Sequence, residues 1–174
     1  MTTANHNNLI NILAFQVIWW AGVLAGNQLI LIPALLVVWH FVVSPQKVID
    51  AKVMFSVVVI GVLSDSLLAA VGIFEFTQLP IWLLLLWGYF AISLNYSLSL
   101  FNALPVAIQA LLGGIFGSLS YIGGANLGAV SLPYGTAFTS GVLFLIWCLL
   151  FPLCLKISLV IRSKQPIKET GQYI

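Results

Sequence analysis

The stretch from residue 53 to residue 74, Val53-Met-Phe-Ser-Val-Val-Val-Ile-Gly-Val-Leu-Ser-Asp65-Ser-Leu-Leu-Ala-Ala-Val-Gly-Ile-Phe74, is apolar at most positions and contains one charged residue, Asp65. At about 1.5 Å of rise per residue, a helix of this length crosses the roughly 30 Å hydrocarbon core of a bilayer. We therefore predict a transmembrane helix over residues 53–74. A carboxyl group at that depth is costly unless it is neutral or paired, which predicts a specific role for Asp65.

The composition of the whole chain indicates the same class. Of its 174 residues, 61% are hydrophobic and 6% are charged, and the mean hydropathy is +1.13. In soluble domains roughly a quarter of all residues are charged. This chain therefore has too few polar side chains to cover a water-exposed surface. We predict an all-α, polytopic membrane helix bundle that forms a single domain over residues 1–174. Continuously apolar segments favour helices over the alternating pattern of a membrane β-barrel.

Six transmembrane helices are predicted. They cover about residues 9–25, 28–43, 53–74, 80–100, 105–122 and 134–160. Residues 44–52 combine proline with charged side chains and are predicted to form a loop. Pro80 and Pro105 begin the fourth and fifth spans, where the missing N–H of proline costs nothing. Because the connections are short, neighbouring helices are expected to be antiparallel.

The six Lys and Arg residues set the predicted orientation. Two of them lie between the second and third spans and four lie at or beyond the end of the sixth: Lys47 and Lys52, then Lys156, Arg162, Lys164 and Lys168. Since connections rich in Lys and Arg stay in the cytoplasm, both groups are placed there. A six-helix count is consistent with this placement. We predict cytoplasmic N- and C-termini, a basic tail over residues 161–174, and an outer location for residues 123–133.

Asp65 lies on a helix face made of small residues. Its neighbours on that face, at intervals of three or four residues, are Gly61, Ala69 and Gly72. A second small-residue face runs along the fifth span through Gln109, Gly113, Gly117, Ser120 and Gly124. Small residues let helix backbones approach closely, so both faces are predicted to pack against neighbouring helices, with Asp65 turned into the bundle.

Depth in the membrane, counted at about 1.5 Å per residue, selects polar partners for Asp65. Gln16 and Ser118 reach a similar depth and are its predicted hydrogen-bond partners. Tyr121 and Asn126 lie at the outer end of the small-residue face, where the backbone of residues 123–126 is expected to be irregular and to face protein or water. These five residues form the predicted ligand or proton site.

Three further candidates for the ligand or proton site are predicted near the cytoplasmic end. They are His40, Asn11 and Asn95, and the difference in depth argues against a direct His40–Asp65 pair. His40 has two readings: a structural hydrogen bond to either asparagine, or a role in carrying protons or contacting a lipid headgroup. Five aromatic residues near the span ends are predicted interfacial anchors: Trp19, Trp20, Trp39, Trp82 and Tyr134.

Several kinds of chemistry have no visible motif in the chain. It contains no phosphate-binding loop, no His-x-x-x-His pair, no Gly-x-Ser-x-Gly elbow and no cluster of Cys and His. We therefore expect no cofactor, no metal and no nucleic-acid partner. The expected partners are the lipid bilayer, a small-molecule or lipid ligand, and a membrane protein or a second copy of the chain.

Four segments carry a resemblance to a known family. They are Asn11-Ile-Leu-Ala-Phe-Gln16 with Trp19, the residue Asp65, Pro80-Ile-Trp-Leu-Leu-Leu-Leu-Trp87, and Gly114-Ile-Phe-Gly-Ser-Leu-Ser-Tyr121-Ile-Gly123. Together they resemble small multi-pass bacterial inner-membrane proteins classed only as a domain of unknown function, over about residues 9–160. The resemblance implies the bacterial cytoplasmic membrane as location, and it implies no activity.

Three functions remain open at this point. The first is binding or transport of a small or lipid-like molecule, with Asp65 as a buried proton or cation site; residues 21–25 and the short helices resemble the substrate-capture subunits of energy-coupling vitamin transporters. The second is an intramembrane enzyme that modifies lipids, with Asp65 as acid or base; residues 61–65 resemble those of lysoplasmalogenase-type hydrolases. The third is an accessory subunit in which Asp65 pairs with a basic residue of a partner.

Overall fold

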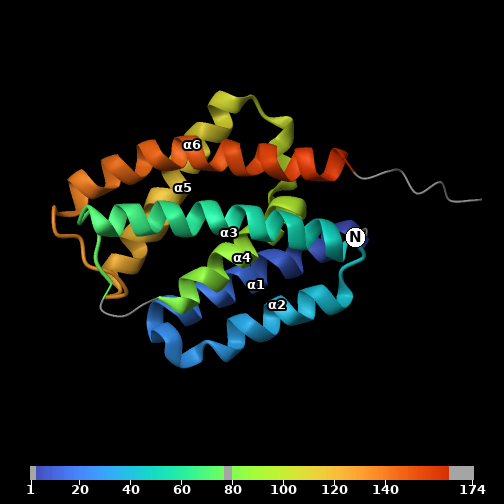
Figure 1. The fold of residues 1–174 in the computed structure, drawn as a ribbon, viewed down its shortest axis with the longest axis horizontal. Helices are drawn as coiled ribbons and strands as arrows, with labels where there is room; N and C mark the ends of the chain where they lie inside the picture. The colour runs from blue at the N-terminus through green and yellow to red at the C-terminus, as the bar shows by residue number, and fades with distance from the viewer. Residues whose placement is uncertain (1–2, 77–79, 165–174) are drawn as a thin grey trace, which may run out of the picture.

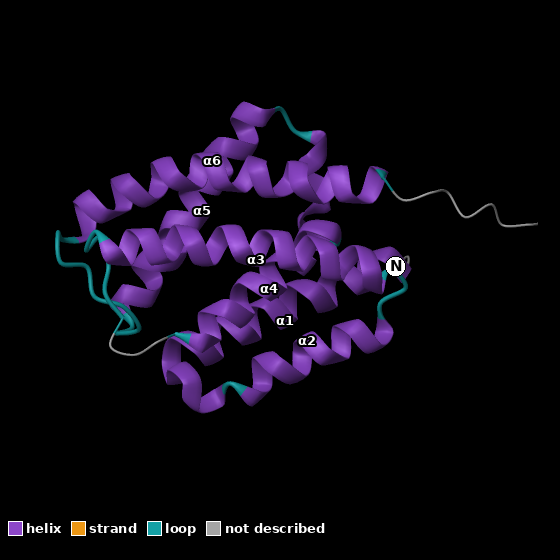
Figure 2. Ribbon diagram, in the orientation of Figure 1, coloured by secondary structure: helices purple, strands orange, loops and turns teal. Residues whose placement is uncertain are grey.

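The protein is a bundle of helices in a computed structural model that describes residues 3–76 and 80–164 (Figure 1). Its elements in chain order are α1 (Thr3–Ala25), the 3-10 helix η1 (Gly26–Leu29), α2 (Leu31–Val43), α3 (Lys47–Ala70), α4 (Ile81–Asn95), the 3-10 helix η2 (Ser97–Ala103), α5 (Val106–Asn126) and α6 (Thr136–Ser163). Short loops join them (Figure 2). The prediction of an all-helical protein is confirmed for the described residues.

In the described part of the chain, four helices are long and apolar enough to cross a membrane: those over Asn8–Leu29, Lys47–Ala70, Val106–Asn126 and Thr136–Ser163. Helices α4 and η2 make a fifth if they count as one span bent by 54°. The sixth predicted span corresponds to α2, whose 13 residues rise only about 20 Å. By length and composition the fold therefore gives four or five spans, and several apolar helices indicate a membrane protein.

Two predicted loops are helical. Residues 47–52 form the first turns of α3, where the Gln46 N–H donates to Ser44 Oγ (3.0 Å) just ahead of the helix and Asp50 places an acid in its first turn. An acid near a helix N-terminus is favoured by the helix dipole, which explains why this charged segment is not a loop. Residues 123–126 complete α5, so the irregular backbone predicted there is wrong.

Helices α3 and α5 end in the same way. Gly72 and Gly128 adopt positive φ angles of 74° and 81°, which favour glycine, immediately after the helix ends. Three residues further on in each case, Glu75 and Ser131 pair as an isolated antiparallel bridge. The structure thus gives Gly72 the role of ending α3, which differs from the packing role predicted for it.

Helix α4 is the central element of the bundle. Every residue from Leu86 to Leu94 is buried, as expected for a helix that is apolar on all sides. Helices α1, α2 and α3 pack against it, and α5 packs along α6 (Figure 1). Burying α4 in this way leaves its aromatic side chains between α1, α3, α5 and α6, where the functional site is found.

Candidate functional site

Asp65 holds two aromatic side chains from neighbouring helices. Its side chain is buried, with 8% of the residue exposed. Oδ2 accepts a hydrogen bond from Trp87 Nε1 at 2.7 Å, and Oδ1 accepts one from the Tyr121 hydroxyl at 2.6 Å. The carboxyl group of α3 therefore fixes the orientation of an indole on α4 and of a phenol on α5.

The partners predicted for Asp65 lie elsewhere. Ser118 Oγ donates to the carbonyl of Gly114, one turn back in its own helix, at 2.6 Å. Serine in a helix commonly satisfies its hydroxyl in this way. Gln16 lies on α1 and lines a cavity that Asp65 does not reach. Tyr121, which the sequence placed in the same site as Asp65, is a direct partner.

Small residues of α3 and α5 make room for a pair of stacked indoles. An added Cβ at Gly61 would overlap the Trp87 ring, and one at Gly117 would overlap the Trp147 ring. The two indoles lie parallel, with ring centroids 5.3 Å apart and an interplanar angle of 2°. Stacked aromatic pairs add to the energy of burial. The two glycines therefore enclose a Trp87–Trp147 stack between them.

The other small residues play lesser parts. An added Cβ at Gly113 would overlap Phe151 of α6. Gly124 would gain only ordinary contacts, at 3.9 Å, with the side chains of Val23 and Val130. Ala69 is half-buried beside the apolar cluster near the end of α3. Within the two predicted small-residue faces, close approach therefore concentrates at Gly61, Gly113 and Gly117.

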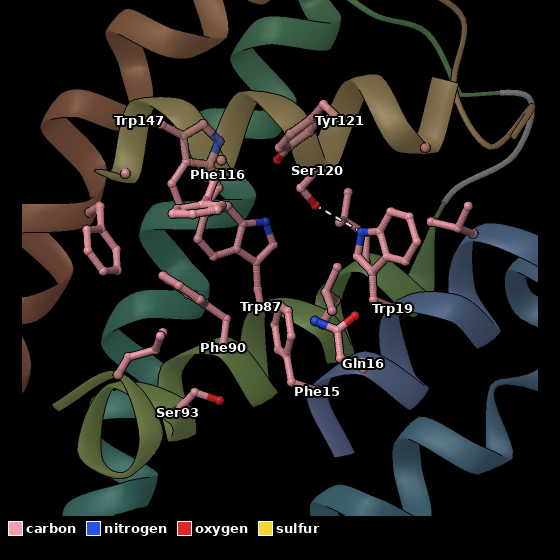
Figure 3. A pocket seen from close by; sticks show the side chains of 18 of the residues that line it. Phe15, Gln16, Trp19, Trp87, Phe90, Ser93, Phe116, Ser120, Tyr121 and Trp147 are labelled. Atoms are coloured by element: carbon pink, nitrogen blue, oxygen red, sulfur yellow. Dashed lines mark hydrogen bonds between the residues drawn. The ribbon is translucent and has the colours of Figure 1, made fainter. Parts of the chain in front are cut away.

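A cavity of about 300 Å³ opens in front of the stack. Its walls come from α1, α4, η2, α5 and α6, and Figure 3 shows Trp87 and Phe90 of α4 facing Phe15 and Gln16 of α1. The lining contains no charged side chain. Polar side chains other than indoles and the phenol are Gln16, Ser93, Ser97 and Ser120. Asp65 does not line the cavity; it lies behind Trp87 and Tyr121.

The mouth of the cavity lies between α1 and α5. Trp19 Nε1 of α1 donates to Ser120 Oγ of α5 at 2.9 Å, which joins the two helices across the mouth (Figure 3). Ile12 and Phe116 line the mouth and are 46% and 63% exposed. Trp19 is therefore part of the site, contrary to its predicted role as an interfacial anchor. Trp82, also predicted as an anchor, is buried.

A second buried acid, Asp50, collects polar side chains near the start of α3. It is 0% exposed, and its Oδ2 accepts hydrogen bonds from Ser44 Oγ (2.6 Å) and from the Tyr96 hydroxyl (2.8 Å). His40 Nε2 lies 2.9 Å from the same oxygen, and Asn95 Nδ2 donates to Oδ1 at 2.8 Å. We call these five residues the Asp50 cluster.

The Asp50 cluster joins four helical elements. Asn95 Oδ1 also accepts a hydrogen bond from Ser158 Oγ of α6 at 2.6 Å, which extends the contacts of α2, α3 and α4 to α6. His40 and Asn95, predicted at a similar shallow depth, do lie together, but through Asp50. Ser44 and His40 both bind the acid and not each other, so they do not form a nucleophile and base pair.

A family model described as "Protein of unknown function (DUF2878)" matches residues 8–153. The chain belongs to the DUF2878 family. This confirms the resemblance to a family classed as a domain of unknown function. No curated protein and no solved structure matches the chain.

Within the DUF2878 match, the remaining predicted site residues lie apart from Asp65. Asn11 is buried and its Oδ1 accepts a hydrogen bond from Ser97 Oγ, a cavity-lining group. Asn126 is exposed at the end of α5. In the part of the chain that the structure describes, no group of three or more His, Cys, Asp or Glu side chains could hold a metal ion. The site's chemistry is thus that of an aromatic cavity supported from behind by an acid.

Sequence reasoning missed Asp50 and most of the cavity. Proline and lysine side chains on either side of Asp50 predict a loop for this segment, although it is helical. The position of Asp50 in the first turn of a helix, ten residues after His40, is the signal that could have placed it. The cavity has no such signal, since its aromatic residues are indistinguishable in sequence from those that face lipid.

Proposed function

We propose that this protein is an integral membrane protein that binds a small apolar or lipid-like molecule in the cavity in front of Trp87 and Tyr121. The cavity itself carries the proposal: it reaches about 300 Å³, it is walled by aromatic side chains, and it holds no charged group. Ligand sites are concave, mostly apolar spaces of about 300–1,000 Å³ with a few placed polar groups. Empty apolar space of this size in a packed bundle is unusual otherwise.

Asp65 acts in this proposal as a positioning residue. It contacts the cavity only through Trp87 and Tyr121, so its function is to fix the two side chains that form the cavity's back wall. Asp65 is 8% exposed and does not line the cavity. Its burial behind the two rings disfavours an acid or base acting directly on a substrate, and it also disfavours contact with a partner's basic residue.

The topology proposed is six membrane crossings with both termini in the cytoplasm of a bacterium. Crossing by the 13 residues of α2 requires it to be extended by η1 and by the polar residues near its ends. Lys47 and Lys52 share a groove with Ile161 near the end of α6, so the cations of α3 and α6 gather on one side. Lys168 lies outside the described residues. Alkaline phosphatase fused after Lys47 should be inactive; an active fusion would overturn this orientation.

Binding is tested by blocking the cavity and measuring what the purified protein carries. Leu112 lines the cavity, whereas its neighbour Leu111 is 47% exposed and does not. We expect Leu112→Trp to lower the amount of a co-purifying apolar molecule, measured by native mass spectrometry and lipid extraction, and Leu111→Trp to leave it at the parent level. A molecule retained equally by both variants would place the site elsewhere and refute the proposal.

A further inference from the structure

Gln16 is an unusual residue for the middle of an apolar helix. In the apolar segment Asn8–Leu29 it lies about 12 Å from one end and about 20 Å from the other. Its side chain lines the cavity and points towards the space in front of Trp87 (Figure 3). Among the described residues, its amide has no hydrogen-bond partner. Gln16 is exposed on α1, one turn after Ile12, so in a bilayer its amide lies at the mouth of the cavity in contact with hydrocarbon. An amide without a partner there is costly, so the cavity's occupant is expected to supply one.

The charge of that occupant follows from the lining. Among the residues that the structure describes, no Lys, Arg, His, Asp or Glu side chain lines the cavity. An ionised headgroup would therefore lose its hydration without gaining a counter-ion. The polar groups that line the cavity are an amide, hydroxyls and indole N–H groups, which suit an uncharged hydroxyl or carbonyl oxygen.

The route into the cavity follows from the packing of α1 and α5. Helix α1 packs against α4, and α5 packs along α6, so the mouth lies between two helices that rest on different neighbours. Beside the Trp19–Ser120 bond, the exposed side chains of Ile12 and Phe116 form its edges. In a bilayer these apolar edges meet acyl chains, so a hydrocarbon chain can enter sideways without crossing water.

We propose that the cavity takes a neutral lipid with an uncharged oxygen, which enters from the bilayer between α1 and α5 and hydrogen-bonds to Gln16. This inference rests on the proposed binding function and names its ligand class. Gln16 is the residue that distinguishes such a lipid from a plain hydrocarbon. The absence of charge in the lining distinguishes it from a fatty acid carboxylate.

The test uses the full chain in phosphatidylcholine nanodiscs and a long-chain alcohol that carries a photoreactive diazirine. Peptide mass spectrometry locates the label, and unlabelled alcohol, carboxylic acid and alkane of equal chain length compete with it. We expect label on cavity residues, and we expect the alcohol to compete roughly tenfold better than the alkane, since tenfold corresponds to about 1.4 kcal/mol, the scale of one hydrogen bond. Gln16→Leu should remove this advantage, and Gln28→Leu, an exposed glutamine of η1 away from the cavity, should keep it.

The possible results separate the two proposals. If the label lies in the cavity but alcohol and alkane compete equally, or the carboxylate competes best, the inference is overturned and the binding function stands. An alcohol advantage that survives in Gln16→Leu also overturns the inference. If the label lies outside the cavity and Leu112→Trp does not reduce it, the binding function itself fails. Circular dichroism and gel filtration of each variant confirm that it is folded.

Discussion

Helix α3 carries two buried acids whose surroundings differ in kind. Asp50 receives polar groups from α2, from the segment after it and from the end of α4. Its partners are buried or half-buried, and none of them lines the cavity. Asp65 receives only an indole and a phenol, and each of those side chains presents another surface to a cavity. One acid joins helices to each other, and the other joins a helix to the wall of a site.

The difference predicts that Asp50 and Asp65, on the same helix, serve stability and ligand binding respectively. Removing the acceptor of the Asp50 cluster leaves several buried donors without a partner, and each is costly. Removing Asp65 leaves two donors unpaired, and it also frees two rings that shape the cavity. The first change should act mainly on folding, and the second on binding. Substitutions that remove each acid in turn test this separation.

The largest expected effect is that of Asp50→Ala. Leaving a buried hydrogen-bonding group without its partner typically costs about 1–3 kcal/mol, and His40, Ser44, Asn95 and Tyr96 would all lose the same acceptor. We expect poor folded yield and a large drop in the thermal unfolding midpoint in detergent. Asp50→Asn keeps one acceptor oxygen and should lose less. Parent-like unfolding of Asp50→Ala would refute a structural role for the cluster.

Asp65→Leu should lower the free energy of unfolding less than Asp50→Ala does, and it should reduce lipid binding more. Two donors, Trp87 Nε1 and the Tyr121 hydroxyl, lose their acceptor, at about 1–3 kcal/mol each. Because both rings are then free to turn, bound lipid should fall well below the parent level, whereas Asp65→Asn retains part of it. Thermal unfolding and lipid extraction on the same samples give both quantities. A variant that unfolds early but still binds at the parent level would assign Asp65 the same role as Asp50.

The Gly61 contact extends the comparison to the Trp87 ring itself. Gly61→Ala would push a methyl group into the indole, and overpacking of this kind should cost about 1–2 kcal/mol and displace the back wall of the cavity. Gly141→Ala is the matched control, because nothing lies within 4 Å of an added Cβ there. In a helix, alanine should stabilise that position by about 0.5–1 kcal/mol. Equal unfolding temperatures for the two variants would show that Trp87 is not held against Gly61.

Much of the fold follows from the apolar pattern, because long apolar runs in this composition can only be membrane helices. The break of α4 at Tyr96 and the shortness of α2 do not follow. Both depend on how polar groups are satisfied inside the bundle, at the Asp50 cluster and at the bond between Ser97 and Asn11. The hydropathy of a segment does not report those pairings.

Asp65 was the part of the site that the sequence singled out most clearly. Asp65 stands out because a carboxyl group in an apolar run is rare, and small-residue spacing indicated a packed face. Its partners were not predictable, because depth along a helix favours Gln16 and Ser118 over Tyr121, which lies nearer the outer end. The rotation and tilt of the helices decide which side chain reaches Asp65, and they bring Tyr121. Trp87 was not predicted as a site residue either, since the sequence does not distinguish a lipid-facing indole in an apolar helix from a buried one.

The smallest expected effect concerns the mouth of the cavity. Trp19→Phe keeps an aromatic ring but loses the bond to Ser120, at about 0.5–1.5 kcal/mol, so the unfolding midpoint should shift little. Because this bond joins α1 to α5, its loss should speed the exchange of bound lipid with the bilayer, measured by the release rate of a photoreactive or fluorescent analogue. Trp39→Phe, an exposed position on α2, is the control for a generic loss of indole. Unchanged release in Trp19→Phe would mean that lipid does not pass between α1 and α5, whereas faster release at unchanged stability separates the mouth from both acids.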